Sequence, residues 1–275
     1  MKKYNVSKTH IISDDKKINL YILKPLDPKP NAPGVLWIHG GGYITGMAKM
    51  YLFSRAKDLV TKYKAVVITP EYRLSKEAPY PAALKDCYQA LRFIKLNAKT
   101  LGINQDQIMV GGESAGGGLC AAVCMLARDK KEINIAYQMP LYPMIDDRDT
   151  PSSKDNHAPV WNTRLNHIGW KAYLGKRYQT NEVSAYAAPA RQTNYANLPP
   201  AYTFVGDIEP FFYETCQFID NLKKAGVPAK VDIYPNCFHA FDMLLPFLPV
   251  SKKAIARFEE EFVYATKHYF AKQNK

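Results

Sequence analysis

The segment that most constrains the fold of this chain joins a predicted strand to a predicted helix. The apolar run 108–110 predicts the strand, and the small, apolar stretch from Gly117 to Leu126 predicts the helix. Between them lies Gly112-Glu113-Ser114-Ala115-Gly116. A Gly-x-Ser-x-Gly turn is so tight that only glycine fits beside the serine, and it holds the serine hydroxyl at the end of the strand. We therefore interpret Ser114 as a candidate nucleophile.

A second glycine-rich segment follows another apolar strand. The run 35–38 leads into His39-Gly40-Gly41-Gly42-Tyr43. Glycines leave backbone N–H groups uncovered, and such groups aimed at one point can stabilise the oxyanion that forms when a carbonyl is attacked. The candidate donors are the N–H groups of Gly41, Gly42 and, after the serine, Ala115. Either segment alone also fits an ordinary connecting loop, but the two in this order favour a catalytic site.

These segments resemble motifs of the hormone-sensitive-lipase-like branch of the α/β-hydrolases, which has an HGGG oxyanion loop and a G-[DE]-S-A-G-G nucleophile turn. Tyr72-Arg73-Leu74 and the run 78–83 are similar to the YRL…PxPAA segment of that family, and the resemblance extends from about Gly34 to Phe241. It implies an α/β-hydrolase fold, with a mostly parallel central sheet, helices on both faces and a small lid insertion. It also implies acyl transfer to serine, which requires no metal and no organic cofactor.

The order of predicted elements agrees with a single domain over residues 1–275. The chain is long enough for one large core, since 47% of its 275 residues are hydrophobic. Partial alternation from His10 to Leu23 predicts an opening hairpin. Apolar runs predict strands at 34–38, 65–69, 135–145, 202–205 and 230–234, and a 3.6-residue period predicts helices at 52–63, 81–102 and 251–269. Alternating strands and helices indicate a parallel sheet with right-handed crossovers.

A polar segment at about 146–181 interrupts this alternation and is predicted to be an insertion between two strands. The resemblance to α/β-hydrolases implies that an insertion here forms a lid or cap. Trp161, Trp170 and Tyr173 from this segment, together with Tyr43 beside the glycine loop, are therefore candidates to line a substrate pocket. The alternative is a surface helix that packs its aromatic side chains on the core.

A serine hydroxyl is a weak nucleophile and needs a base whose ring is held by a third group. His239 is the candidate base because it follows the last predicted strand, which gives the order serine, acid, histidine. It resembles the histidine of the family's H-G-F motif, with Ala240 in place of glycine. Asp207 and Glu209 lie on one loop and are both candidate acids.

The spacing of the family motif favours Glu209 over Asp207 as the acid. When residues 225–227 and His239 are placed in register with that motif, Glu209 falls at the acid position. Asp207 remains the alternative, because it is the shorter carboxylate at the very end of the predicted strand.

Charge and cysteine content restrict the classes of partner. The net charge is +12, but the lysines occur as scattered doublets such as Lys2-Lys3 and Lys223-Lys224, so we expect solvated surfaces and no nucleic-acid partner. No stretch reaches the roughly 18 apolar residues of a membrane span, and no apolar signal segment follows Met1. The five cysteines are an odd number without metal-ligand spacing, which favours the reducing cytoplasm and no metal site. A homodimer is left open.

These observations favour a serine carboxylic-ester hydrolase that acts on small, short-acyl esters through an acyl-enzyme on Ser114. Short chains are expected because only about nine residues precede the opening hairpin, which leaves little of the helical N-terminal cap found in the resembled family. One alternative is a deacetylase of acetylated sugars or related natural acetyl esters. Another is a non-catalytic ligand receptor on the same fold, as gibberellin receptors are in plants. Such receptors lack the catalytic histidine, so His239 argues against this interpretation.

Overall fold

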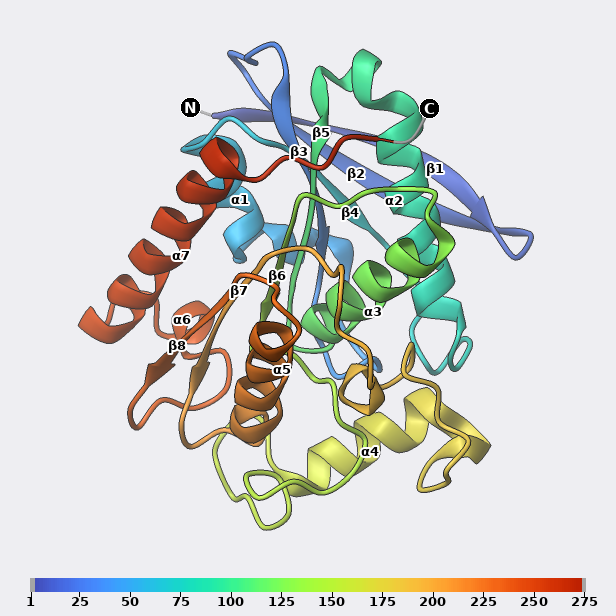
Figure 1. The fold of residues 1–275 in the computed structure, drawn as a ribbon, viewed down its shortest axis with the longest axis vertical. Helices are drawn as coiled ribbons and strands as arrows, with labels where there is room; N and C mark the ends of the chain where they lie inside the picture. The colour runs from blue at the N-terminus through green and yellow to red at the C-terminus, as the bar shows by residue number, and fades with distance from the viewer. Residues whose placement is uncertain (1–2, 274–275) are drawn as a thin grey trace.

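The computed structural model describes residues 3–273, which form one eight-stranded sheet flanked by helices (Figure 1). The strands are β1 (Tyr4–Ser13), β2 (Lys16–Pro25), β3 (Ala32–Ile38), β4 (Val66–Pro70), β5 (Ile103–Glu113), β6 (Tyr137–Leu141), β7 (Ala201–Gly206) and β8 (Ala229–Tyr234). They lie in the order β1-β2-β4-β3-β5-β6-β7-β8. β2 is antiparallel to β1 and β4, whereas all neighbouring pairs from β4 to β8 are parallel. The predicted mostly parallel α/β sheet is therefore confirmed.

Helices cover both faces of this sheet. They are α1 (Arg55–Thr61), α2 (Ala82–Leu101), α3 (Ala115–Lys130), α4 (Thr163–Leu174), α5 (Phe212–Lys224), α6 (Phe241–Leu244) and α7 (Pro249–His268), with short 3-10 turns η1 (Ala48–Leu52), η2 (Gly175–Arg177) and η3 (Pro189–Arg191). α1 and α7 pack on one face, where Leu59 and Phe258 are buried. α2, α3 and α5 pack on the other, where Leu91, Leu119 and Phe218 are buried.

The opening hairpin is longer than its hydrophobic pattern predicts. β1 and β2 pair over their whole length, from Tyr4 with Pro25 to Ser13 with Lys16. β1 is at the edge of the sheet and most of its side chains are exposed, so its first half lacks the alternation expected of a half-buried strand. The inner strands differ, because all five residues of β4 are buried, which accounts for its continuous apolar sequence.

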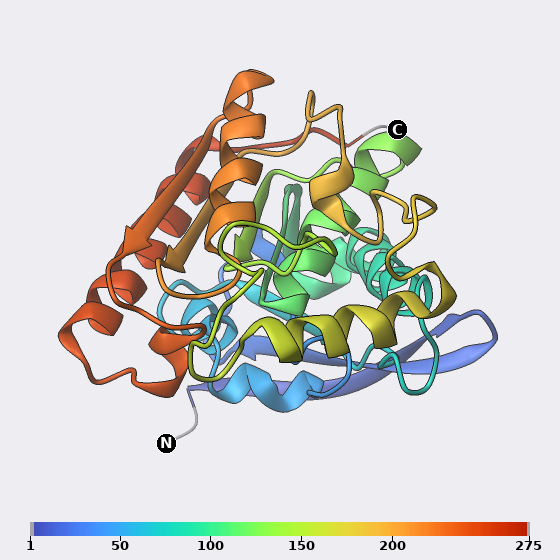
Figure 2. The same cartoon turned by 90° about the horizontal axis from the view of Figure 1, so that it is seen from below.

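The segment between β6 and β7, where an insertion is predicted, contains α4. Asn162 caps this helix by accepting a hydrogen bond from Leu165 N at 3.1 Å, and Gly175 ends it with a φ of 58°. α4 crosses one end of the sheet (Figure 2). A Cβ on Gly169 of α4 would lie 3.0 Å from the Gly42 carbonyl oxygen, so the helix packs directly on the glycine loop.

Three loops at this end of the sheet carry the predicted site residues. Ser114 follows β5, Glu209 follows β7 and His239 follows β8. Because these strands are parallel, their carboxyl ends meet at one edge, which is where α/β sheets bind ligands.

Candidate active site

Ser114 occupies a strained turn between β5 and α3. Its backbone has φ 59° and ψ −122°, a combination that residues with a side chain rarely adopt. A Cβ on Gly112 would lie 2.5 Å from the Gly116 carbonyl oxygen, and a Cβ on Gly116 would overlap the Ile38 carbonyl oxygen. Glycine at both positions therefore allows β3, β5 and α3 to approach closely enough to form the turn.

Ser114 and Glu209 lie on opposite sides of the His239 ring. Ser114 Oγ is 2.9 Å from His239 Nε2. Glu209 Oε2 forms a short contact with His239 Nδ1, and the other carboxylate oxygen accepts a hydrogen bond from Gly206 N at 3.0 Å. The exposed fractions of Ser114, His239 and Glu209 are only 7%, 4% and 0%. The arrangement can therefore move a proton from the serine to the imidazole with little competition from water.

Two aromatic rings fix the orientation of the imidazole. Phe211 meets the His239 ring edge-on with the centroids 5.0 Å apart, and Tyr142 does the same at 5.1 Å. These perpendicular contacts, together with the carboxylate at Nδ1, hold Nε2 toward the serine.

Asp207, the alternative acid, lies away from His239. Its Oδ1 accepts a hydrogen bond from Asn236 N at 2.6 Å, and its side chain is exposed. The structure therefore brings Glu209 to the imidazole. The longer side chain is turned inward by its bond to Gly206 N, whereas Asp207 joins its loop to the loop after β8.

The glycine loop after β3 lies against Ser114. Gly41 and Gly42 have positive φ values of 119° and 59°, and a Cβ on Gly40 would lie 3.1 Å from Ser114 Cβ. Within residues 3–273, the N–H groups of Gly41, Gly42 and Ala115 donate no hydrogen bond to a protein acceptor. Three uncovered donors next to the serine are available to an oxyanion.

His39 anchors the start of this loop. Its ring stacks on Tyr72 with the centroids 4.2 Å apart, and its Nδ1 lies 2.8 Å from the Gly40 carbonyl oxygen. The Tyr72 hydroxyl donates to the His39 carbonyl oxygen at 2.9 Å. Burial lowers the pKa of His39 to about 4, so the imidazole is neutral at pH 7 and shapes the loop without adding charge to it.

A cavity of about 190 Å³ opens beside Ser114 and His239. Its wall is formed mainly by the side chains of Met50, Tyr142, Val160, Trp161, Met243 and Leu244. These are largely apolar, so the cavity suits an apolar substituent. Sequence reasoning missed all of them except Trp161, because they belong to no motif. For Met50, Val160, Met243 and Leu244 a signal was present, because they lie close along the chain to the glycine loop, to Trp161 or to His239; Tyr142 had no such signal.

Of the four aromatic residues expected at the pocket, only Trp161 lines it. Tyr43, Trp170 and Tyr173 are at most 1% exposed and pack together. The rings of Tyr43 and Tyr173 stack with the centroids 3.9 Å apart, and Trp170 lies 5.5 Å from Tyr43. The pocket prediction is therefore wrong for these three residues. They form the core between α4 and the glycine loop, which is the alternative that the sequence left open.

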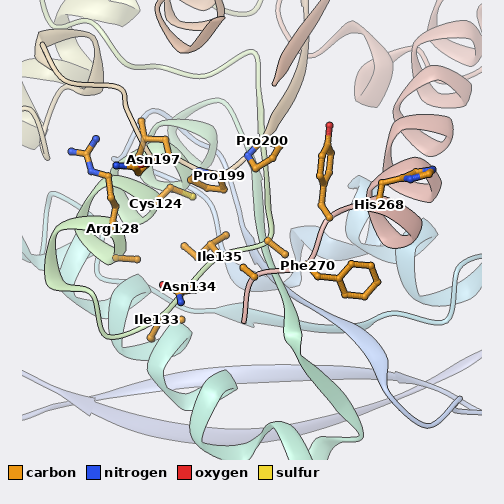
Figure 3. A pocket seen from close by; sticks show the side chains of 15 residues that line it. Cys124, Arg128, Ile133, Asn134, Ile135, Asn197, Pro199, Pro200, His268 and Phe270 are labelled. Atoms are coloured by element: carbon orange, nitrogen blue, oxygen red, sulfur yellow. The ribbon is translucent and has the colours of Figure 1, made fainter. Parts of the chain in front are cut away.

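A larger cavity of about 310 Å³ lies at the other end of the sheet (Figure 3). Its lining includes Ala136 and Pro200, which immediately precede β6 and β7, and Arg128 and Phe270 stand on opposite sides of it. The Arg128 guanidinium is already bonded to the carbonyl oxygens of Asn194 and Ala196. This cavity is at the amino ends of the strands, and the residues between 3 and 273 that line it include no nucleophile paired with a base.

The described part of the chain matches neither of two patterns, a cluster of metal ligands and a membrane-spanning helix. No group of three His, Cys, Asp or Glu side chains within residues 3–273 could hold a metal ion. No helix over the same residues has the length and apolar character needed to cross a bilayer. The five cysteines are all free.

The chain matches the model of a family with the alpha/beta hydrolase fold over residues 35–243, which include both glycine motifs and His239. Esterase LipI of Mycobacterium tuberculosis is 31% identical over 228 residues, which are 82% of this chain and 71% of LipI. Carboxylesterase NlhH of the same species is 29% identical over 237 residues, which are 83% of this chain and 72% of NlhH.

Solved structures agree with the family match. A bacterial heroin esterase superposes with a TM-score of 0.89 and 32% identity over 93% of this chain and 82% of that protein. Esterase LipW of Mycobacterium marinum gives a TM-score of 0.88 and 28% identity over 96% of this chain and 82% of LipW. This chain therefore belongs to the hormone-sensitive-lipase-like branch of the α/β-hydrolase family and is a carboxylesterase-type hydrolase.

Proposed function

We propose that this protein hydrolyses small, short-acyl carboxylic esters through an acyl-enzyme on Ser114. The observation that carries the proposal is the line of contacts from Ser114 Oγ through both nitrogens of His239 to Glu209. In this assignment Ser114 is the nucleophile, His239 the general base and Glu209 the acid that holds the imidazole.

In the first half of the reaction, His239 Nε2 takes the hydroxyl proton as Ser114 Oγ attacks the ester carbonyl carbon. Glu209 accepts a hydrogen bond from the Nδ1–H group of His239 and so stabilises the imidazolium that forms. The tetrahedral oxyanion is stabilised by the N–H groups of Gly41, Gly42 and Ala115. His239 then gives the proton to the leaving alkoxide, the carbon–oxygen bond breaks, and the alcohol departs.

In the second half, a water molecule takes the place of the alcohol. His239 removes one of its protons as the oxygen attacks the acyl-enzyme, and it returns that proton to Ser114 Oγ when the acyl bond breaks. The products are a carboxylic acid and the free enzyme. Every proton taken up is released, and the chain's own residues are sufficient for each step.

The short-acyl preference rests on the size and chemistry of the cavity beside Ser114. Its volume of about 190 Å³ is below the roughly 300 Å³ at which pockets for drug-sized ligands begin. Apart from Ser114, His239, Glu113 and Tyr142, the described residues that line the cavity offer a sugar no polar side chains, which disfavours the deacetylase of acetylated sugars. We propose further that residues 1–275 act as one domain and that the insertion at about 146–181 serves as the lid, with Trp161 as its contribution to the cavity.

The test is initial-rate hydrolysis of p-nitrophenyl esters from acetate to decanoate, with the Ser114→Ala variant purified in parallel. We expect the highest kcat/KM on acetate and butyrate, a decline with chain length, and loss of activity in the variant with unchanged circular dichroism. Equal activity in the variant would contradict Ser114 as the nucleophile. A wild-type protein that binds such esters without cleaving them would favour the receptor instead.

A further inference from the structure

Three ionisable side chains are buried close to the reacting residues. Glu113, Arg55 and Asp242 have exposed fractions of 3%, 5% and 0%. Burying charge is costly unless a partner compensates it, so the pairing of these three groups matters. None of them belongs to the Ser114, His239 and Glu209 constellation, and sequence reasoning gave no role to any of them.

Asp242 has two partners. Its Oδ1 accepts a hydrogen bond from the Tyr142 hydroxyl at 3.0 Å, and its Oδ2 lies 3.6 Å from Arg55 Nε. Within the described residues neither Arg55 Nε nor Asp242 Oδ2 has a hydrogen-bond partner, so the charge attraction between them is their principal interaction. Arg55 Nη1 also pairs with the partly exposed Asp58 at 3.2 Å.

Glu113 contacts the backbone of Arg55. Its carboxylate accepts hydrogen bonds from Trp37 Nε1 at 2.8 Å and from Arg55 N at 3.4 Å. The pKa of Glu113 is raised to about 8, mainly by burial; the Asp242 charge acts in the same direction, and the Trp37 hydrogen bond and Arg55 oppose it. Glu113 is therefore largely protonated at pH 7, which leaves the Arg55 charge to compensate Asp242.

This ion pair connects the loop of His239 with segments next to Ser114 and the glycine loop. Asp242 is three residues after His239, and Tyr142, which bonds Asp242, also presents its ring edge to the imidazole. The Tyr142 backbone continues from Leu141, whose carbonyl oxygen accepts the Ser114 N–H at 3.0 Å. Arg55 opens α1, the helix that follows the glycine loop and η1.

We propose that Arg55 is a positioning residue: its buried ion pair with Asp242 holds the loop of His239, and the Tyr142 ring behind it, in register with Ser114. This inference rests on the proposed esterase function. Without the guanidinium, the Asp242 carboxylate is a buried charge lacking its counter-ion. It then gains a proton, draws in water or turns toward solvent, and a turn of Asp242 moves the short helix α6 that His239 precedes. A displacement of reacting groups by about 1 Å is enough to slow an enzyme by about 100-fold.

The test compares Arg55→Gln, Arg55→Lys and the matched surface control Arg92→Gln on p-nitrophenyl acetate. Arg92 is exposed and lies on α2, which packs on the face of the sheet opposite to α1. The Glu132 carboxylate is 4.0 Å from the Arg92 guanidinium. We expect Arg55→Gln to lower kcat by about 10- to 100-fold with KM within about twofold, because substrate contacts are untouched. Arg55→Lys keeps the charge and restores most of kcat, and Arg92→Gln behaves as wild type.

Two further variants separate positioning from a purely structural role. Tyr142→Phe keeps the ring beside His239 but removes the hydroxyl bond to Asp242, and it should lower kcat in the same direction. Arg55→Gln combined with Asp242→Asn removes both charges and should recover part of the kcat lost by Arg55→Gln alone. All rates are measured about 15 °C or more below the melting temperature of each variant, so that every protein compared is folded.

The outcomes distinguish this inference from the proposed function. An inactive wild type overturns both. An active wild type with unchanged kcat in Arg55→Gln and Tyr142→Phe overturns only the positioning role. A loss of melting temperature in Arg55→Gln without a loss of kcat in the folded protein also overturns it, since Arg55 would then act on stability alone.

Discussion

Asp207 and Glu209 stand two residues apart on one loop, and their carboxylates face different parts of the molecule. Glu209 contacts the imidazole of His239, whereas Asp207 accepts the backbone N–H of Asn236. The two acids therefore form a matched pair, in which one has a proposed catalytic role and the other joins two loops.

The first prediction uses this pair. Glu209→Gln should lower kcat/KM by about 10³-fold or more, because the amide no longer stabilises the imidazolium, whereas Asp207→Asn should stay within about threefold of wild type. Both changes replace a carboxylate by its amide at nearly constant volume. Steady-state kinetics on p-nitrophenyl acetate provide the measurement, and the reverse ranking would assign the acid to Asp207.

The second prediction concerns the glycine loop. A Cβ on Gly42 would overlap the Trp161 ring, and the residue has a φ of 59°. Gly42→Ala should shift the loop and its N–H donor and reduce kcat by about 10²- to 10³-fold. Gly226→Ala is the control. Gly226 also has a positive φ, of 77°, but an added Cβ would meet no neighbouring atom, so this variant has the backbone strain without the clash.

A double variant tests whether the overlap with Trp161 causes the loss of kcat expected for Gly42→Ala. Gly42→Ala combined with Trp161→Ala relieves the overlap and should recover part of kcat. No recovery in the double variant, or full activity in Gly42→Ala, would count against Gly42 as an oxyanion donor. Gly226→Ala should cost about 1 kcal/mol of stability and leave kcat unchanged.

The third prediction concerns substrate size. Trp161 is the one aromatic ring from the insertion that lines the cavity, so Trp161→Ala should enlarge it and move the preferred acyl chain from acetate or butyrate toward hexanoate or octanoate. The control is Trp170→Leu, which alters a fully buried ring outside the cavity. This variant should lower the melting temperature but keep the chain-length order. A chain-length profile unaffected by Trp161→Ala would mean that another wall sets the limit.

The fourth prediction concerns pH and stability. Burial raises the pKa of Glu113 from 4.5 to about 8, so between these values the native state binds a proton that the unfolded state has released. The stability contributed by this group is fully present below pH 4.5 and is lost as the pH rises through 8. A tenfold difference in proton affinity between the two states corresponds to about 1.4 kcal/mol, so the loss amounts to several kcal/mol.

Glu113→Gln isolates this effect, because the amide keeps an acceptor for Trp37 Nε1 but does not titrate. Urea unfolding from about pH 5 to 9 should find the variant gaining stability relative to wild type as the pH rises. A difference between the two proteins that is independent of pH would contradict a buried, protonated Glu113.

Much of the fold follows from local sequence. Strands such as β3 and β4 are continuous apolar runs because both faces are covered, and the turn at Ser114 is marked by glycines that no other residue can replace. The spacing from residues 225–227 to His239 favours Glu209. Glu209 is the acid that contacts the imidazole, because the bond from Gly206 N turns its carboxylate inward.

The remaining features depend on contacts between distant segments. Trp170 and Tyr173 of α4 point into the core, whereas Trp161, which precedes the helix, lines the cavity. A 3.6-residue period predicts that one face of a helix is buried, but it does not specify which neighbour that face contacts. Arg55 and Asp242 are 187 positions apart in the numbering (242 − 55), so the sequence gives no indication that the two side chains form a pair. The first half of β1 is exposed on the edge and lacks a hydrophobic signal.

At Ser114, the backbone conformation that presents the proposed nucleophile also lowers the stability of the fold. With φ 59° and ψ −122°, this residue occupies a region that glycine enters freely and that costs a residue with a Cβ about 1–3 kcal/mol. Ser114→Gly should therefore unfold at a higher temperature than both Ser114→Ala and the wild type, while lacking the hydroxyl. Selection for a long-lived fold alone would place glycine here, and only selection for a working nucleophile retains serine.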